Sequence, residues 1–471
     1  MAVDSVRRAP RALVVPLHLQ GHFTPILHII RQLAKNRINF TVLSTQERCD
    51  ELSRYKANGD FGDMDADFIP LFRDFSKETP PRPYPYMLED WKLGFTEADA
   101  SRYTFMITDM FVYFIQDDAD KWGIPRYTLI TTPCHACLYL LQGEKIVEEG
   151  WLFSIPDKRH QSITLPGLQL FSPLQCPRTI TGFPPEQMLP KIGVSFRKSA
   201  GLLFNSFQAY DKEPLEIMSR QPEITQFPGK DPPKLFAIGP LMSLPQPSEN
   251  LHELISTKSN EMREIIDWLD GQRNSSVLFI SLGSMRPLPR KGATAFAEAL
   301  EQTRIPFFWV LRLPPKHSKD NYLPPGFEAR TRTQGIVWTG WVPQPQLLQH
   351  PSIGGFLSHC GWNSLTEVIT AGVPIAACPM YAEQGFNAKY IVDVLEIAVE
   401  VKYKEDFFDF DSEEVAVAIS TLMNEEKGAK VRQNMHNMRK AVFEAVAEGG
   451  TSHRAFEEFI ATILNHEPIN S

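Results

Sequence analysis

The sequence predicts an α/β protein with two Rossmann-like domains, each a doubly wound parallel sheet. The first observation is a β-α-β pattern, in which apolar runs at 13–17 and 38–44 flank an amphipathic helix at 26–36. The second is a strand, turn and helix pattern at 353–371. The third is the length of 471 residues, which exceeds one ordinary hydrophobic core. We place the domain boundary in the Pro- and Ser-rich stretch 243–250.

Composition and charge narrow the class of partner. A net charge of −8 and a pI near 5.9 argue against nucleic acid, for which a basic surface is expected. The sequence contains no run of about 18 apolar residues, the length that a membrane span needs, and no cleavage pattern of a signal peptide. We therefore expect a cytoplasmic protein without a membrane span.

Two patterns resemble metal sites, and we interpret neither as one. Cys134-x-x-Cys137 is a single pair among six scattered cysteines, so we expect buried packing residues rather than zinc ligands or a redox pair. Asp63, Asp65 and Asp67 do not complete a calcium loop, and we interpret them as a solvated acidic loop. No metal ligand set is therefore expected.

Polar side chains follow three expected strands of the N-terminal half. His22 lies in the turn after the first strand, Asp109 ends a second, and Thr131 ends a third. Because parallel α/β sheets place ligands and catalytic groups at the carboxyl ends of their strands, these residues are candidates for a site. His18 flanks the same turn and can line it. A lone histidine is nevertheless more often structural than catalytic.

The stretch 80–95 is rich in proline and aromatic residues. Two interpretations of its rings remain open, an apolar ligand pocket and ordinary core packing. The aromatic residues concerned are Tyr84, Tyr86, Trp91 and Phe95.

The stretch from Trp341 to Gln384 combines an aromatic side chain, an anion-binding turn and polar side chains at fixed offsets. The helix expected over 365–371, closed by Gly372, would present unpaired N–H groups and its positive dipole end to a diphosphate. His359 can donate to the same phosphates.

Two further residues of this stretch suit a nucleotide, although one has a second interpretation. Glu367 can accept hydrogen bonds from ribose hydroxyls. Ser364-x-x-Glu367 is, however, also a capping-box pattern that opens many ordinary helices. The residues alone leave both interpretations open.

The 44 residues from Trp341 to Gln384 resemble the signature box of plant secondary-product UDP-glycosyltransferases, the family 1 glycosyltransferases with the GT-B fold. The segment 16–25, P-x-x-x-Q-G-H-x-x-P, and the segment ending at Asp109 are similar to two N-terminal motifs of that family. A turn at Gly283-Ser284 is similar to its S-x-G-S/T diphosphate segment.

The resemblance implies two domains that face a central cleft. An acceptor-binding domain would cover residues 1–245 and a UDP-sugar-binding domain residues 246–450. The last segment, 451–471, would form a helix that packs back on the N-terminal domain.

The resemblance also assigns roles to single residues. His22 would be the base that takes the acceptor proton, and Asp109 would orient it. The implied donor contacts are Trp341, Val342 and Gln344 with uridine, Glu367 with ribose, Ser284, His359, Asn363 and Ser364 with the diphosphate, and Trp362, Glu383, Gln384 and Thr131 with the sugar.

The expected reaction is inverting transfer of a sugar from a UDP-sugar, as co-substrate, to a hydroxyl of a small phenolic, flavonoid or terpenoid acceptor. No cofactor is implied. Glutamine at position 384 usually accompanies UDP-glucose in the family, and its amide can both donate to and accept from sugar hydroxyls, whereas Glu383 accepts only when ionised. A nucleotide-sugar epimerase of the same fold and a non-catalytic UDP-sugar binding protein are the alternatives, and the pairing of His22 with Asp109 argues against the second.

Overall fold

The structure is a computed structural model, and the chain divides into two compact units. Unit 1 comprises Met1–Ser243 and Glu444–Ser471, and unit 2 comprises Leu244–Phe443. The structure describes residues 10–73, 83–177, 184–242, 260–283, 287–403, 409–424 and 426–465.

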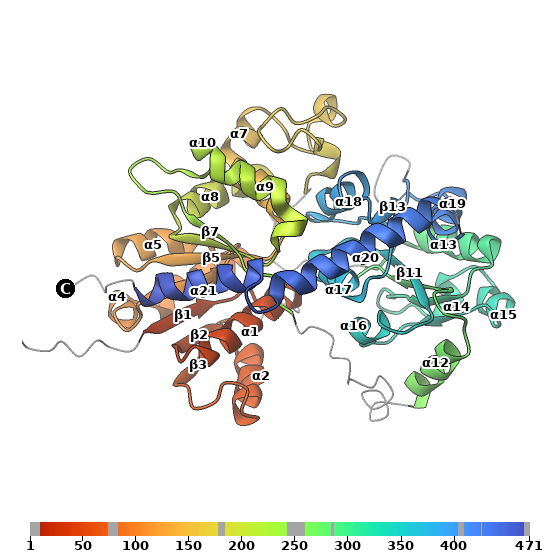
Figure 1. Ribbon diagram of the computed structural model, residues 1–471, viewed down its shortest axis with the longest axis horizontal. Helices are drawn as coiled ribbons and strands as arrows, with labels where there is room; N and C mark the ends of the chain where they lie inside the picture. Colours follow the sequence, from red (N-terminus) through yellow and green to blue (C-terminus); the bar gives the residue numbers. More distant parts are fainter. Residues whose placement is uncertain are drawn as a thin grey trace, which may run out of the picture. The chain divides into compact units, whose positions relative to one another are not determined.

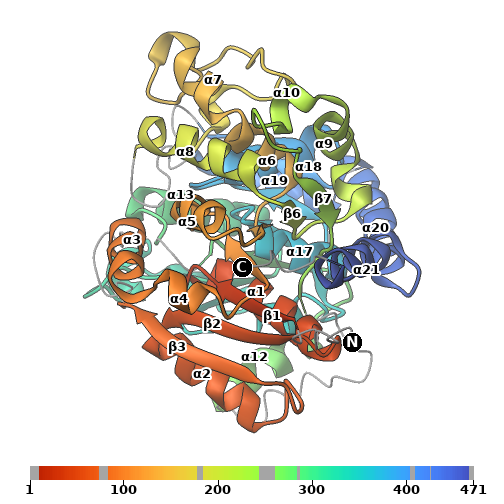
Figure 2. The same ribbon diagram turned by 90° about the vertical axis from the view of Figure 1, so that its left-hand side faces the viewer.

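Unit 1 is built on a seven-stranded parallel sheet in the order β3-β2-β1-β4-β5-β6-β7. Figure 2 shows β3, β2 and β1 side by side. Because β1 has β2 on one side and β4 on the other, the strand order reverses there, and α/β proteins bind ligands at such a switch point. The strands are β1 (Arg11–Val15), β2 (Asn39–Thr45), β3 (Ala66–Phe72), β4 (Phe105–Asp109), β5 (Arg126–Ile130), β6 (Gly201–Phe204) and β7 (Lys234–Ala237).

The sheet of unit 1 is buried on both faces, as a parallel sheet requires. In β1, Ala12 and Val14 belong to one core cluster, and Leu13 and Val15 belong to the other. Helix α1 and helix α21 contribute to the first cluster, and α3 and α5 to the second. The helices of unit 1 are α1 (Gln20–Lys35), α2 (Gln46–Ala57), α3 (Pro83–Gly94), α4 (Glu97–Ala100), α5 (Gln116–Lys121), α6 (Cys134–Leu141), α7 (Gly143–Glu148), α8 (Pro185–Lys198), α9 (Gln208–Arg220), α10 (Pro222–Thr225) and α21 (Thr451–Leu464).

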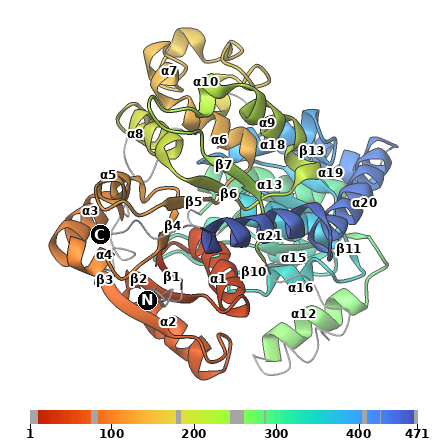
Figure 3. The same cartoon turned by 60° about the vertical axis from the view of Figure 1, so that its left-hand side comes forward.

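Helix α21, although last in the chain, packs against the sheet of unit 1, beside β7 (Figure 3). Its buried Phe459 meets Tyr127 of β5 and Phe236 of β7 edge to face, with ring centroids 5.2 Å and 5.6 Å apart. The aromatic contacts therefore fix the helix to two strands that precede it by more than 200 residues.

Unit 2 is built on a six-stranded parallel sheet in the order β10-β9-β8-β11-β12-β13. Helices α13 and α19 pack against each other and share one core with the sheet (Figure 1). The strands are β8 (Val277–Ser281), β9 (Phe307–Val310), β10 (Gly335–Trp338), β11 (Ile353–Ser358), β12 (Ile375–Ala377) and β13 (Ala398–Glu400). The helices are α12 (Asn260–Asp270), α13 (Arg290–Thr303), α14 (Lys319–Tyr322), α15 (Phe327–Thr331), α16 (Gln344–Leu347), α17 (Trp362–Ala371), α18 (Gln384–Asp393), α19 (Ser412–Asn424) and α20 (Glu426–Val446).

Two helices begin earlier than the sequence predicts. Helix α1 starts at Gln20 rather than at residue 26, because Pro25 lies inside the helix, where it removes only one backbone hydrogen bond near the start. Helix α17 starts at Trp362 rather than at residue 365. As a result, His22 and Ser364 each lie in the first turn of a helix.

The structure tests the two metal-like patterns. All six cysteines are free and buried, which confirms the interpretation of Cys134 and Cys137 as packing residues. Asp67 lies in β3, and its carboxylate, like that of Asp65, is ion-paired with Arg11, so the solvated-loop interpretation is wrong for this residue. Within the described ranges, no three His, Cys, Asp or Glu side chains gather where they could hold a metal ion.

None of the helices in the described part of the chain combines the length and the apolar character that crossing a membrane requires.

Candidate active site

A histidine and a carboxylate meet at the switch point of unit 1. His22 lies in the first turn of α1 and Asp109 ends β4, and these elements are brought together because β1 and β4 are paired neighbours. The Nδ1 atom of His22 is 2.8 Å from Oδ2 of Asp109. The backbone N–H of Phe111 donates to the other carboxylate oxygen at 2.9 Å.

The hydrogen bonds that Asp109 accepts determine which nitrogen of His22 carries the hydrogen. Asp109 is fully buried and accepts hydrogen bonds on both carboxylate oxygens. Because an ionised carboxylate can only accept, Nδ1 of His22 carries the hydrogen, and Nε2 is the basic nitrogen of the ring. The ring of Phe111 also contacts the imidazole, with centroids 5.4 Å apart. This arrangement can abstract a proton from a hydroxyl group.

Thr131, which follows β5, contributes a second oxygen to the same imidazole nitrogen. Its Oγ1 lies 2.9 Å from Nδ1 of His22 and 3.3 Å from Sδ of Met110. The resemblance implies a sugar contact for Thr131, whereas the structure gives its hydroxyl a partner within unit 1. Sequence reasoning missed this pairing because it does not reveal that β5 neighbours β4.

A buried arginine behind the pair was also missed. Burial lowers the pKa of Arg126 to about 9, and the carboxylates of Asp109 and Asp120 act in the opposite direction. The guanidinium is therefore a cation at neutral pH, in a fully buried position. It donates to Thr108, Gln116, Ser195 and Ser199 at distances between 2.7 and 3.1 Å.

Trp91, in the aromatic segment before Asp109, is part of the hydrophobic core of unit 1. Trp91 is 1% exposed, its indole N–H donates to Asp118 at 2.8 Å, and its ring stacks on Phe95 with centroids 4.5 Å apart. Of the two interpretations left open for this ring, core packing is therefore confirmed and the acceptor-pocket interpretation of Trp91 is wrong. The side chains of Tyr84 and Tyr86 lie outside the described part of the structure. His18 is buried beside the same edge, and Arg48 donates to its backbone carbonyl.

In unit 2, an amide side chain links the first turn of α17 to its second turn. The Nε2 atom of Gln344 donates to Oγ of Ser364 at 3.0 Å and to Oε2 of Glu367 at 2.7 Å. The N-cap of α17 is Gly361, and no side chain caps the helix. The capping-box interpretation of Ser364 and Glu367 is therefore wrong.

Burial raises the pKa of Glu367 to about 7, although the hydrogen bond from Gln344 opposes the shift. The carboxylate is half-buried at the side of α17. Trp341 lies near the start of the same stretch and is 68% exposed, which is unusual for a large aromatic side chain. Val342, which follows it, is buried. The exposed indole face suits stacking on a base, and the half-buried carboxylate of Glu367 suits hydrogen bonds from sugar hydroxyls.

His359 is enclosed by two glycines at the end of β11. A Cβ atom on Gly283 would lie 2.7 Å from its Nε2, and one on Gly361 would lie 2.4 Å from it, so the imidazole needs glycine at both positions. Burial lowers the pKa of His359 to about 4, and its buried Nδ1 has no hydrogen-bond partner in the described part of the chain. A neutral imidazole can donate one N–H to a bound anion.

The turn after His359 orients the start of α17. Cys360 has a φ of 63°, a conformation that only a few per cent of residues other than glycine adopt. Asn363 and Ser364 then occupy the first turn of α17, at the positive end of the helix dipole. Trp362 is buried. Ser284, implied at the same diphosphate site, lies outside the described residues.

The side chain of Gln384, at the end of the stretch 341–384, makes contacts that the sequence does not predict. Oε1 of Gln384 accepts from the backbone N–H groups of Met380 and Tyr381, both at 3.0 Å. Because both partners are donors, the oxygen is committed to the loop, and the side chain has only its NH₂ group for a ligand. The expectation that this amide both donates to and accepts from a sugar is therefore wrong. Asn387, which sequence reasoning missed, donates to the Cys360 carbonyl at 2.9 Å and to Glu383 at 3.4 Å.

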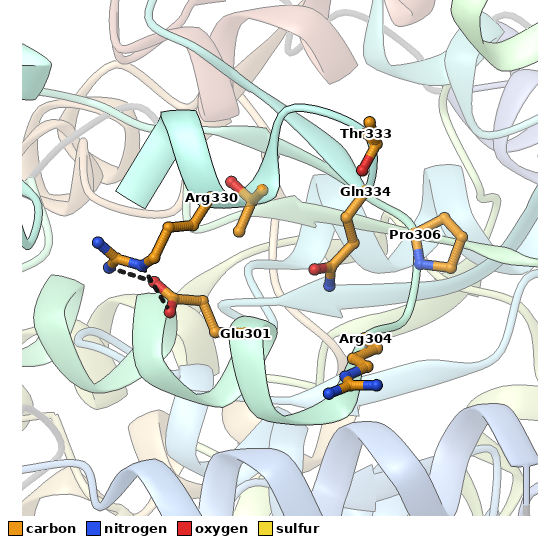
Figure 4. Close-up of a pocket in the computed structure, with 7 residues that line it drawn as sticks. Glu301, Arg304, Pro306, Arg330, Thr333 and Gln334 are labelled. Atoms are coloured by element: carbon orange, nitrogen blue, oxygen red, sulfur yellow. Dashed lines mark hydrogen bonds and ion pairs between the residues drawn. The ribbon is translucent and has the colours of Figure 1, made fainter. Parts of the chain in front are cut away.

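A separate surface hollow of unit 2 contains none of the expected site residues (Figure 4). It is lined by polar side chains, including Arg304 and Gln334, and by an ion pair between Arg330 and Glu301 at 2.7 Å. Its lining contains neither an aromatic side chain nor the start of a helix that could hold a nucleotide, so we assign it no ligand.

The sequence and the fold are similar to those of known proteins. The family model described as "UDP-glucoronosyl and UDP-glucosyl transferase" matches residues 252–440. UDP-glycosyltransferase 71C2 of Arabidopsis thaliana is 32% identical over 376 residues, covering 77% of this chain and 74% of that protein. The (R)-mandelonitrile beta-glucosyltransferase of Prunus dulcis is 26% identical over an alignment that covers 98% of this chain and 99% of that protein.

Solved structures share the whole architecture. A UGT transferase from Siraitia grosvenorii in complex with UDP has a TM-score of 0.78 at 28% identity, covering 97% of this chain and all of that one. UGT71G1 of Medicago truncatula, complexed with UDP-glucose, has a TM-score of 0.78 at 22% identity and covers 98% of this chain. Two parallel α/β units of this kind define the GT-B class of glycosyltransferase. The chain belongs to the plant family 1 UDP-glycosyltransferases, enzymes that act on small molecules, and the resemblance read from its motifs is confirmed.

Proposed function

We propose that this enzyme transfers glucose from UDP-glucose to a hydroxyl group of a small apolar acceptor of the phenolic, flavonoid or terpenoid type, with inversion at the anomeric carbon. The observation that carries the proposal is the 2.8 Å contact between His22 and the fully buried Asp109. The names of relatives, among them an isoflavone 7-O-glucosyltransferase of Glycine max, support the choice of donor and acceptor class. The six free cysteines support a reducing compartment, the cytoplasm.

The proposed reaction is a single displacement. Nε2 of His22 takes the proton of the acceptor hydroxyl, whose oxygen forms a bond to the anomeric carbon as the bond from that carbon to the diphosphate breaks. Asp109 keeps the imidazole in the required tautomer and balances the charge of the imidazolium. UDP leaves with the electron pair of the broken bond, and no covalent enzyme intermediate forms.

The leaving diphosphate would be held by the first turn of α17. Its backbone N–H groups, at Asn363 and Ser364, are fixed before the reaction and therefore need no reorganisation when charge develops. The neutral imidazole of His359 adds one donor. Together these donors provide the stabilisation of a leaving anion that helix starts offer.

The uridine would be held by the exposed ring of Trp341 and by the half-buried carboxylate of Glu367. The indole of Trp341 offers the base a stacking face, which is worth roughly 1–3 kcal/mol in other base-binding proteins. Glu367 would accept hydrogen bonds from the ribose, while Gln344 holds its carboxylate from the other side. Such contacts fix the donor before the sugar is engaged.

The sugar would be recognised through one donor and one acceptor. The NH₂ group of Gln384 would donate to a hydroxyl oxygen, and Glu383 would accept from a neighbouring hydroxyl. Because the Gln384 oxygen is bound to the loop at 380–381, this donor has a fixed direction. The fixed direction supports discrimination between sugars that differ at one hydroxyl.

We expect His22→Ala to reduce transfer to hydroxyl acceptors by roughly 10²–10⁴-fold, as loss of a general base does. UDP affinity, measured by calorimetry, should stay near that of the wild type, because the base and the UDP contacts belong to different units. His28→Ala, a half-buried histidine on the same helix, is the matched control and should retain activity. Wild-type transfer by His22→Ala would show that the base is another group.

The affinity for UDP-glucose should depend on pH through Glu367. Its pKa of about 7 means that the carboxylate is largely protonated at pH 6 and ionised at pH 8. Ribose hydroxyls donate better to the ionised form, so the dissociation constant should rise as pH falls through 7. Glu367→Gln should bind more weakly at pH 8 and lose most of the pH dependence between 6 and 8. UDP-glucose is the appropriate ligand because its diphosphate diester does not titrate in this range.

The same pH profile in Glu367→Gln as in the wild type would assign the titration to another group. A wild type whose affinity is constant from pH 6 to 8 would contradict the role of Glu367 in holding the ribose.

Gln384 offers a test of donor choice. Gln384→Glu can keep the hydrogen bonds from Met380 and Tyr381 but presents an acceptor in place of the NH₂ group. We expect kcat/KM for UDP-glucose to fall by roughly 10–100-fold, corresponding to one lost hydrogen bond and a partner left unpaired. Gln384→Ala should add a loss of loop order, seen as a lower melting temperature.

The measurement compares UDP-glucose, UDP-galactose, UDP-xylose and UDP-glucuronate with one accepted phenol. A donor other than UDP-glucose that leads by tenfold in the wild type would contradict the proposed donor. An unchanged ranking and rate in Gln384→Glu would instead contradict the sugar contact.

A further inference from the structure

We propose that Thr131 is a positioning residue for the catalytic base, and that its hydroxyl shares the Nδ1 hydrogen of His22 with Asp109. The proposal rests on the function proposed above, in which His22 is the base. Its support is geometric: Oγ1 of Thr131 lies 2.9 Å from Nδ1, and Oδ2 of Asp109 lies 2.8 Å from the same atom. The contacts of a single ring nitrogen with two oxygens form a three-centre arrangement.

The direction of each hydrogen bond follows from what the groups can donate. The carboxylate of Asp109 only accepts, so Nδ1 must carry the hydrogen. Thr131 cannot then donate to that nitrogen, and its own hydrogen points to Sδ of Met110, 3.3 Å away. The oxygen of Thr131 therefore faces the imidazole as an acceptor.

The sheet holds both acceptors in place. Asp109 ends β4, Thr131 follows β5, and these two strands are paired, with Asp109 opposite Leu129. Asp109 is fully buried and Thr131 is 5% exposed, so water competes little for either contact. Two acceptors anchored to adjacent strands resist a tilt of the ring that a single acceptor would allow. The direction of the Nε2 lone pair is fixed in consequence.

This role differs from a contact with the donor sugar. A sugar contact would make Thr131 affect the KM for UDP-glucose and the ranking of donors. A positioning role would make Thr131 affect kcat, and the size of that effect would depend on whether Asp109 also holds the imidazole. The two roles are therefore separable by kinetics.

The experiment is a double-mutant cycle. Thr131→Val removes the hydroxyl at nearly constant shape, and Thr131→Ser restores it. Each is measured alone and together with Asp109→Ala. Thr132→Val is the matched control, because it removes a neighbouring buried hydroxyl that has no hydrogen-bond partner in the described residues. Thermal melting of each variant checks that it is folded.

We expect Thr131→Val alone to lower kcat by roughly 2–10-fold, the effect of one neutral hydrogen bond, with KM for UDP-glucose unchanged. In the Asp109→Ala background, Thr131→Val should lower kcat by on the order of 10²-fold. Thr131 is then the remaining one of the two acceptors, and its loss leaves the Nδ1 hydrogen of His22 without either of them. Thr131→Ser should recover most of the rate in both backgrounds, and Thr132→Val should match its parent.

Asp109→Asn provides an independent readout of the tautomer. The N–H of Phe111 donates to Oδ1, so the asparagine oxygen stays there and its NH₂ group faces Nδ1. The imidazole must then accept at Nδ1 and carry its hydrogen on Nε2, which removes the base. In Asp109→Ala, Thr131 can still accept from Nδ1, so the base is retained. We therefore expect Asp109→Ala to be more active than Asp109→Asn, although asparagine is closer to aspartate in size and shape.

Each outcome decides one question. Equal losses from Thr131→Val in both backgrounds, or a changed KM and donor ranking, would overturn the positioning role and support a sugar contact. If Thr131→Val leaves the rate of its parent unchanged in both backgrounds, the hydroxyl has no role. If His22→Ala retains full transfer, the function proposed for His22 fails, whatever the Thr131 variants show.

Discussion

The hydrogen bond between His22 and Asp109 depends on the order of strands in the sheet of unit 1. The two residues are 87 positions apart, and they meet because β1 lies beside β4 at the point where the strand order reverses. Full burial of Asp109, with the Phe111 N–H on its second oxygen, keeps the carboxylate oriented without help from solvent. The chemistry at Nε2 is therefore a consequence of the fold.

In unit 2, the shape of the candidate donor site depends on backbone conformation at a few positions. The imidazole of His359 fits only because Gly283 and Gly361 have no Cβ, and Gly283 has a φ of 84°. Cys360, in the turn before α17, and Ala382, just before α18, both have left-handed backbone, a strained conformation that proteins often place at ligand sites. Asn387 connects these two turns, since it donates to the Cys360 carbonyl and to Glu383. Rigid turns of this kind suit a site that binds a flexible diphosphate.

The sequence predicts the elements better than the contacts between them. The strand Ile353–Ser358 and the helix end at Gly372 agree with the structure, because apolar runs and a left-handed glycine are local signals. The amphipathic pattern begins at residue 26, whereas α1 begins at Gln20 and contains Pro25, so the pattern places the start of this helix too late. No local signal gives the order of strands, so the contact of Thr131 with His22 was not predicted.

Side-chain roles in the donor stretch were predicted only in part. The spacing of Ser364 and Glu367 left a capping box open as an interpretation, yet it did not reveal that Gln344 bridges the two residues and that the capping role is absent. The oxygen of Gln384 accepts from backbone N–H groups of a loop in which Ala382 has a φ of 52°. Hydrogen bonds of this kind depend on three-dimensional packing, which the spacing of residues along the chain does not reveal.

The central claim is a direct displacement with one base and no covalent intermediate, and the configuration of the product tests it most directly. UDP-glucose carries an α-linked sugar, so proton NMR of the glucoside formed with one accepted phenol reports the stereochemical course. We predict a β-glucoside as the sole initial product, because one displacement inverts the anomeric carbon. An α-glucoside would contradict the account, since it requires a second displacement or a different attacking face, neither of which His22 and Asp109 provide.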